Sequence, residues 1–172
     1  MKLPMHAMAV QSFVPMLESL SEILEKGQAS EKGIYLVDAR LAPNMYTLAQ
    51  QVRLACDHAK DGSARLAGLV APHFADDETN IGALRGRIAG TIGYLKGLDP
   101  SSFEDAEDRD SSIALPGGKM IAMDGLQFLR GWALPHFYFH LVTAYGILRH
   151  NGVAIGKRDY MSYIGAFIRD AA

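Results

Sequence analysis

Four long segments of this chain repeat apolar residues at intervals of three and four, and this periodicity constrains the fold more than any other feature. Such spacing places the apolar side chains on one face of an α-helix. Helices of about 20–25 residues each extend roughly 30–37 Å, the scale of a four-helix bundle. The segments cover residues 5–27, 45–68, 78–97 and 125–150. The sequence therefore predicts an all-α four-helix bundle.

The ends of these segments carry helix start and stop signals. Gly27 is a plausible stop for the first helix, and Pro15 predicts either a kink or a start near residue 12. Asp76 or Asp77 is expected to cap the third helix, and Asp124 the fourth. Asn151-Gly152 is expected to close the fourth helix by a left-handed cap, and Gly97 to end the third.

Three further stretches lie outside the long helices. The connector 28–44 is expected to reach the bundle through its apolar residues Leu36, Ala39 and Leu41. Two short apolar runs flank Pro116-Gly-Gly118 and predict a small β-hairpin over residues 113–123, before the last long helix. The partly apolar tail 153–172 is expected to pack as a short helix or against a partner.

Composition narrows the class of protein. A chain of 172 residues, 49% apolar and 21% charged, fits one globular domain over residues 1–172. The net charge is −2 and Lys/Arg clusters are absent from the sequence, which argues against nucleic-acid binding. No run of 18 apolar residues and no signal-peptide pattern occurs, so we expect no membrane partner. The single cysteine, Cys56, excludes an internal disulfide and suits the cytoplasm.

The fourth segment holds the most suggestive chemistry. His136 and His140 are four residues apart, so both imidazoles lie on one helical face that also carries apolar residues. Two interpretations stay open. Each histidine can be a core or cleft residue with a hydrogen-bonded neighbour, or the pair can share a divalent metal with a third ligand and a water. On spacing alone the first is favoured, because His-x-x-x-His also occurs by chance. Pro135, just before the pair, predicts a kink there.

A third metal ligand would have to come from a neighbouring helix. His58 lies beside the apolar stripe of the second segment and can reach an inter-helix cleft, whereas Asp57 falls on the opposite side. His6 is another possible contributor. His73 follows a proline in a loop and His150 ends a helix, so both fit structural roles better.

Cys56 and a glycine-rich turn carry weaker signals. Cys56 lies mid-helix near the apolar stripe, where a thiol is usually inert. The stretch from Gly152 to Lys157 lacks the spacer and the Ser/Thr of a phosphate-binding loop, and is interpreted as a helix end and turn.

Several strings resemble an uncharacterised bacterial family of unknown function that belongs with the DinB/YfiT-like helical bundles. The strings run along nearly the whole chain and include Asp38-Ala-Arg-Leu-Ala-Pro-Asn-Met45, Gln51-Val…Asp57, Ala64-Arg-Leu-Ala-Gly68, Ala133-Leu-Pro-His-Phe-Tyr-Phe-His140, Thr143-Ala-Tyr-Gly-Ile-Leu-Arg-His-Asn-Gly152 and Gly156-Lys-Arg-Asp159. The resemblance implies a DinB-like four-helix bundle, commonly a homodimer, in a superfamily of metalloenzymes.

In that superfamily, one histidine of the second helix and a His-x-x-x-His pair of the fourth typically hold a metal. The resemblance thus implies a divalent ion, zinc or nickel, held by His136, His140 and His58. Some superfamily members transfer small thiols. The sub-family resembled here often carries Asn at the place of His136 and another residue at that of His58.

Two functional hypotheses follow. The chain is a metal-dependent enzyme of DinB type, such as a thiol-dependent transferase or a hydrolase. Alternatively, it is a non-catalytic dimeric bundle that binds a small apolar ligand among the aromatic residues of the fourth helix. The sequence holds no complete catalytic set and names no substrate.

Overall fold

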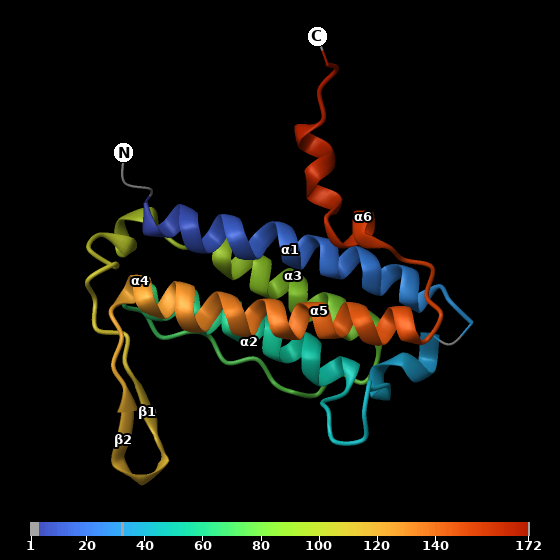
Figure 1. The fold of residues 1–172 in the computed structure, drawn as a ribbon, viewed down its shortest axis with the longest axis horizontal. Helices are drawn as coiled ribbons and strands as arrows, with labels where there is room; N and C mark the ends of the chain where they lie inside the picture. The colour runs from blue at the N-terminus through green and yellow to red at the C-terminus, as the bar shows by residue number, and fades with distance from the viewer. Residues whose placement is uncertain (1–3, 32, 172) are drawn as a thin grey trace.

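The computed structural model describes residues 4–31 and 33–171 and forms an antiparallel bundle of long helices (Figure 1). Helix α1 spans Met5–Gln28, α2 spans Leu48–Leu66 and α3 spans Ile81–Lys96. The last long helix is continuous over 125–150 and consists of α4 (Gly125–Phe128), a π-helical turn (Leu129–Ala133) and α5 (Leu134–His150). Helix α1 packs along α3, whereas α2 packs against both α3 and α5. The predicted all-α four-helix bundle is confirmed.

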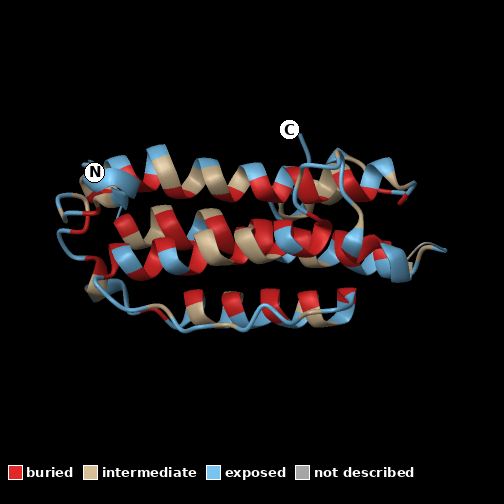
Figure 2. Ribbon diagram, turned by 90° about the horizontal axis from the view of Figure 1, so that it is seen from below, coloured by how far each residue is buried: buried red, intermediate tan, exposed pale blue. Residues whose placement is uncertain are grey.

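The core lies where the helices face one another, as the buried residues in Figure 2 show. The apolar positions expected from periodicity account for much of it, because side chains three and four residues apart share one helical face. The largest fully buried side chains include Phe13, Leu17, Leu48, Leu84 and Phe137. Phe13 of α1 and Phe137 of α5 meet edge to face at 4.9 Å between ring centroids, which joins opposite sides of the bundle.

Helix starts follow local capping chemistry. The side chain of Thr47 accepts from the backbone of Gln50, whose side chain accepts in return from the Thr47 backbone, so α2 begins three residues later than expected. Asp124 and Gln127 form the same reciprocal cap before α4, as predicted for Asp124.

The expected cap of α3 by Asp76 or Asp77 is wrong: Asn80 accepts from Ala83 N at 2.9 Å. Asp76 lies four residues before Asn80, and its carboxylate pairs with an arginine of α3, described below.

The last long helix absorbs its proline without losing continuity. Pro135 lies in the first turn of α5 and lacks the N–H that an α-helix would use there. The preceding five residues widen into the π-helical turn. Helix α2 approaches this turn closely: a Cβ added at Gly62 would come within 3.2 Å of the Ala133 Cβ. The expected kink is therefore a local widening where α2 and the last helix touch.

The segments that connect the long helices contain short elements of their own. A 3₁₀ helix (Gly33–Asp38) buries Leu36, and Ala39 packs against the core. Leu41 is 42% exposed, but its side chain lies beside Gly146 of α5, so the connector contacts the bundle as expected. Another short 3₁₀ helix covers Pro100–Phe103.

Strands β1 (Ile113–Leu115) and β2 (Lys119–Ile121) pair antiparallel, with Ile113 opposite Ile121, and confirm the hairpin. A 3₁₀ turn over Pro116–Gly118 joins them, and Gly117 and Gly118 supply its positive φ angles.

The C-terminal segment leaves the bundle after α5 (Figure 1). Gly152, at φ 89°, closes α5 as predicted. A short helix, α6 (Lys157–Tyr160), and a 3₁₀ helix (Ser162–Phe167) follow. Ser162 is hydrogen-bonded to Ser19 of α1 at 2.9 Å, which fastens the base of this segment to the bundle.

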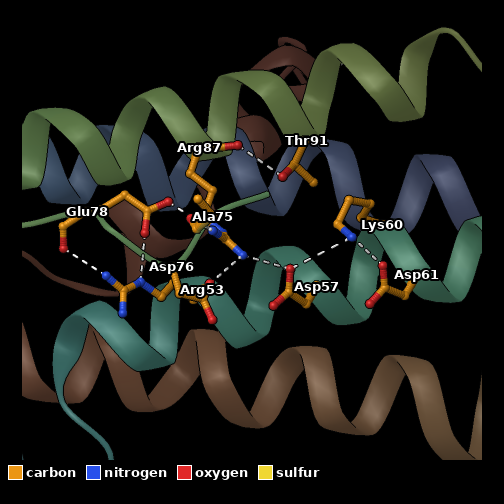
Figure 3. Close-up of polar contacts among 9 residues, drawn as sticks. All are labelled: Arg53, Asp57, Lys60, Asp61, Ala75, Asp76, Glu78, Arg87 and Thr91. Carbon is orange, nitrogen blue, oxygen red and sulfur yellow. Dashed lines mark hydrogen bonds and ion pairs between the residues drawn. The ribbon is translucent and has the colours of Figure 1, made fainter. Parts of the chain in front are cut away.

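The segment 67–80 between α2 and α3 has no regular helix, yet one arginine fixes it (Figure 3). Arg87 of α3, whose side chain is 2% exposed, lies 2.9 Å from Asp57 of α2, 3.1 Å from Asp76 and 2.9 Å from Glu78. It also donates to the Ala75 carbonyl at 2.9 Å. Arg53 of α2 binds the Glu78 carboxylate at 2.7 Å. The buried guanidinium therefore ties α2, α3 and the loop together.

Among the helices formed by residues 4–31 and 33–171, none has both the length and the apolar character that crossing a membrane requires.

Replacing Asn80 by Ala is expected to lower the free energy of unfolding by about 1 kcal/mol, because the N-cap side chain of α3 is lost. Asp77→Ala is the matched control, since the sequence alone offers it as the cap and the structure gives that role to Asn80. Urea unfolding of both variants measures the effect. Equal losses in the two variants would contradict the assignment of Asn80.

Replacing Arg87 by Met is expected to lower the free energy of unfolding by about 3 kcal/mol, because the half-buried Asp57 and the nearly buried Glu78 lose a cation. Arg130→Met, at an exposed position of the last helix, serves as the control. Chemical denaturation followed by circular dichroism measures both. A loss no greater than that of the control would show that the buried ion pairs are not needed for stability.

Candidate functional site

The two histidines of the last helix face the bundle interior, as the sequence predicted. His140 is 6% exposed and His136 is half-buried. They lie just after the π-helical turn, on the side of α5 that packs against α2. Their position follows from helical spacing, because residues four apart lie one turn from each other on one face.

His58 of α2 completes a cluster with them. Its ring stacks on that of His136, with centroids 4.7 Å apart, and on that of His140, with centroids 5.4 Å apart. Trp132 extends the stack, with its ring centroid 4.3 Å from that of His136. The fold thus brings together the three residues that the sequence offered as metal ligands, and their role as ligands stays a prediction.

Hydrogen bonds set the tautomers of two of these imidazoles. His136 Nδ1–H donates to the Trp132 carbonyl at 2.8 Å, and a carbonyl oxygen can only accept. His140 Nδ1–H donates to Gln51 Oε1 at 2.8 Å. The Gln51 amide nitrogen faces the Tyr46 carbonyl at 3.5 Å, which is consistent with this orientation of the amide. In the neutral form of each ring, Nε2 therefore carries the lone pair.

Gln51 is a residue of this cluster that sequence reasoning did not single out. It is 1% exposed, and its only sequence signal is a polar amide one residue before Val52, a position of the buried stripe. A buried amide needs hydrogen-bond partners, and His140 supplies one. Gln51 thus acts on the cluster by holding the ring of His140.

The imidazoles of His58 and His140 favour the neutral form. Burial, together with the neighbouring rings of His136 and His140, lowers the pKa of His58 to about 4. Burial, together with His136, lowers the pKa of His140 to about 4. Neutral imidazoles with free lone pairs are the form in which histidine binds metals.

The nitrogen atoms of the three imidazoles are suitable ligands for a divalent metal, but the rings are not arranged around a common point. A metal ligand that donates its other ring N–H to a carbonyl is a common support of a metal site. In residues 4–31 and 33–171, however, no group of three or more His, Cys, Asp or Glu side chains is arranged to hold a metal ion. The three rings lie as a stack, with planes 25° and 8° apart, so a shared ion requires the side chains to rotate.

The remaining candidates lie elsewhere or are inert. His6 packs edge-on against Phe103, with ring centroids 5.1 Å apart. His73 and His150 are exposed. Cys56 is fully buried, and burial raises the pKa of its thiol to about 12, which confirms the expected inert thiol.

The predicted position of Asp57, on the side of α2 away from the core, is wrong. Asp57 is half-buried and pairs with Arg87 of α3. The reason is that α2 packs against neighbours on two sides, so a residue opposite its main stripe is also covered.

A pocket of about 420 Å³ reaches the histidine cluster at His58. His58, Asp57 and Asp61 line it from α2, and Trp132 and Phe128 line it from the last helix. The rest of its lining is Leu54, Gly62, Arg65, Ile113 and Ala133. Its size lies within the range of small-molecule sites, and it gives a ligand access to His58.

The helical bundle and its hairpin have the architecture of a DinB-like helical-bundle protein. The chain is similar over nearly its whole length to a solved structure of a DinB family member protein from Shewanella denitrificans. The two are 39% identical, the alignment covers 91% of this chain and 90% of that chain, and the TM-score is 0.82.

A family model assigns the chain to one family of such proteins. Residues 5–161 match the model of the family described as Domain of unknown function (DUF1993), and the chain belongs to that family. A comparison with curated proteins found no match.

Lowering the pH from 6.5 toward 4 is expected to destabilise the metal-free protein. In this interval the unfolded chain binds protons on His58 and His140 while the folded chain, with both pKa values near 4, does not. The loss at pH 5 is about 2 kcal/mol per histidine.

Urea titrations at pH 7, 6 and 5 measure this loss. His140→Asn is expected to remove about half of the pH dependence, because His58 still contributes, whereas the exposed His150→Asn should keep all of it. A wild-type stability that does not change over this interval would contradict the neutral, buried state of the cluster.

Proposed function

We propose that this protein binds a divalent metal, zinc or nickel, through His136, His140 and His58, and that it acts as a metal-dependent enzyme. The observation that carries the proposal is the gathering of three imidazoles from two helices next to a pocket. Membership of a family with a DinB-like bundle supports it.

The residues around the imidazoles suit this role. Gln51 and the Trp132 carbonyl each hold one ring through Nδ1–H and leave Nε2 to face a ligand. His58 has the least constrained position of the three, because it is half-buried and lines the pocket. Rotation of His58 out of the stack is therefore the simplest way to bring three nitrogens onto one ion.

A bound divalent metal would lower the pKa of a water or thiol next to it and so supply a nucleophile at neutral pH. The chain's own residues would position the reactants. Asp57 and Asp61 lie on the pocket wall within the same turns of α2 as His58, and their carboxylates can accept a proton there. Trp132 and Phe128 line the pocket from the last helix and give it apolar surface. A thiol-dependent transfer or a hydrolysis fits this arrangement.

Elemental analysis of tag-free protein tests the metal site. After incubation with zinc, nickel or manganese and removal of excess ion, we expect close to one metal per chain. His140→Ala and His58→Asn are expected to lose the metal, because each removes one of three ligands. His150→Ala keeps all three and is the control.

Two results would contradict the proposal. One is folded wild-type protein that takes up no metal under any of these conditions. The other is metal content that is unchanged in both His140→Ala and His58→Asn, since the ion would then be held elsewhere. Circular dichroism spectra establish that each variant is folded before it is analysed.

A further inference from the structure

The pocket beside the histidines carries two opposite charges that do not pair with each other. Asp61 and Arg65 are one helical turn apart on α2, a spacing at which an acid and a base commonly attract. Instead, the Asp61 carboxylate binds Lys60, and Arg65 donates to the Ser112 carbonyl at 2.9 Å. The two side chains are thus held apart on the same pocket wall.

Both charged groups keep free bonding capacity toward the pocket. The Asp61 side chain is 59% exposed, and a carboxylate has about four lone-pair sites, of which Lys60 uses one. A guanidinium has five N–H donors, and that of Arg65 uses one for Ser112. The Arg65 guanidinium also lies 5.5 Å from the centre of the Phe128 ring, which fixes its position at the rim.

The remaining walls are apolar. The side chains of Trp132, Phe128 and Ile113 lie across from α2, and Leu54 and Ala133 complete the apolar lining. A pocket of about 420 Å³ with these walls accommodates a small molecule with one short hydrocarbon group.

We propose that this pocket binds a small zwitterion, an amino acid with an aliphatic side chain or a compound that carries the same ammonium and carboxylate groups. Asp61 binds the ammonium group, Arg65 binds the carboxylate, and the hydrocarbon group packs against Trp132 and Ile113.

Charge decides between this ligand and simpler ones. A plain anion would meet the carboxylates of Asp57 and Asp61, and a plain cation would meet Arg65. Only a ligand that carries both charges can pair with the Asp61 carboxylate and with the Arg65 guanidinium. Its role as substrate rests on the proposed metal-dependent function, because His58 lies on the same pocket, but its binding does not.

The single tryptophan of the chain, Trp132, allows a direct test by intrinsic fluorescence. The probes are L-leucine, L-leucinamide, which lacks the carboxylate, and N-acetyl-L-leucine, which lacks the ammonium group. Each is titrated into the full-length protein with EDTA and, separately, with zinc, and isothermal calorimetry provides a second readout. We expect leucine to bind about tenfold more tightly than either derivative, because each derivative loses a charged hydrogen bond.

Variants assign each group to its partner. Asp61→Asn is expected to abolish the preference for leucine over N-acetylleucine, and Arg65→Gln the preference for leucine over leucinamide. Asp77→Asn and Arg149→Gln change exposed charges that do not line this pocket and are expected to leave both preferences intact.

The outcomes separate this proposal from the metal site. Leucine binding in EDTA together with a failure to take up metal would leave the zwitterion site standing and remove the proposed metal function. Equal binding of the three probes, binding of none of them, or preferences that survive both pocket substitutions would each overturn the zwitterion site.

Discussion

Helix α2 is covered on two sides, by α3 and by α5, and the rest of the molecule is arranged around this constraint. A helix in that position cannot leave polar side chains on its flanks without partners, because buried polar groups are costly when unpaired. On the flank toward α3, Asp57 and Arg53 join the network of Arg87 and Glu78. On the flank toward α5, Gln51 and His58 meet the histidine pair.

The same constraint explains why the functional candidates gather where they do. Burial drives the imidazoles of His58 and His140 toward the neutral form. The acceptors Gln51 Oε1 and Trp132 O select the tautomers of His140 and His136. The π-helical turn places Trp132 so that its ring lies on His136 while its edge lines the pocket. The contact of α2 with the last helix therefore buries the rings of His58 and His140 and favours their neutral form. The same contact forms the pocket through which a small molecule reaches His58.

The bundle could be predicted from the sequence because its helices are long and strongly periodic. Features that depend only on nearby residues could also be predicted from the sequence. They are the hairpin around Pro116-Gly-Gly118, the Asp124 cap and the end of α5 at Gly152. The start of α3 was misplaced because Asp76, Asp77 and Asn80 are all residue types that cap helices, and the structure gives that role to Asn80 while Asp76 pairs with Arg87. A cap is a local interaction, but pairing with Arg87 depends on how α3 docks on α2.

By itself, the sequence determined the helices and the presence of His136 and His140 on one helical face, because spacing along a helix fixes direction. It also offered His58 as a residue that can reach a cleft between helices. Only the tertiary structure decided that Asp57 is covered, that Gln51 holds His140, and that Asp61 and Arg65 share a pocket with Trp132. Periodicity within one helix reveals a buried face but not which neighbour covers it, and these contacts depend on that neighbour.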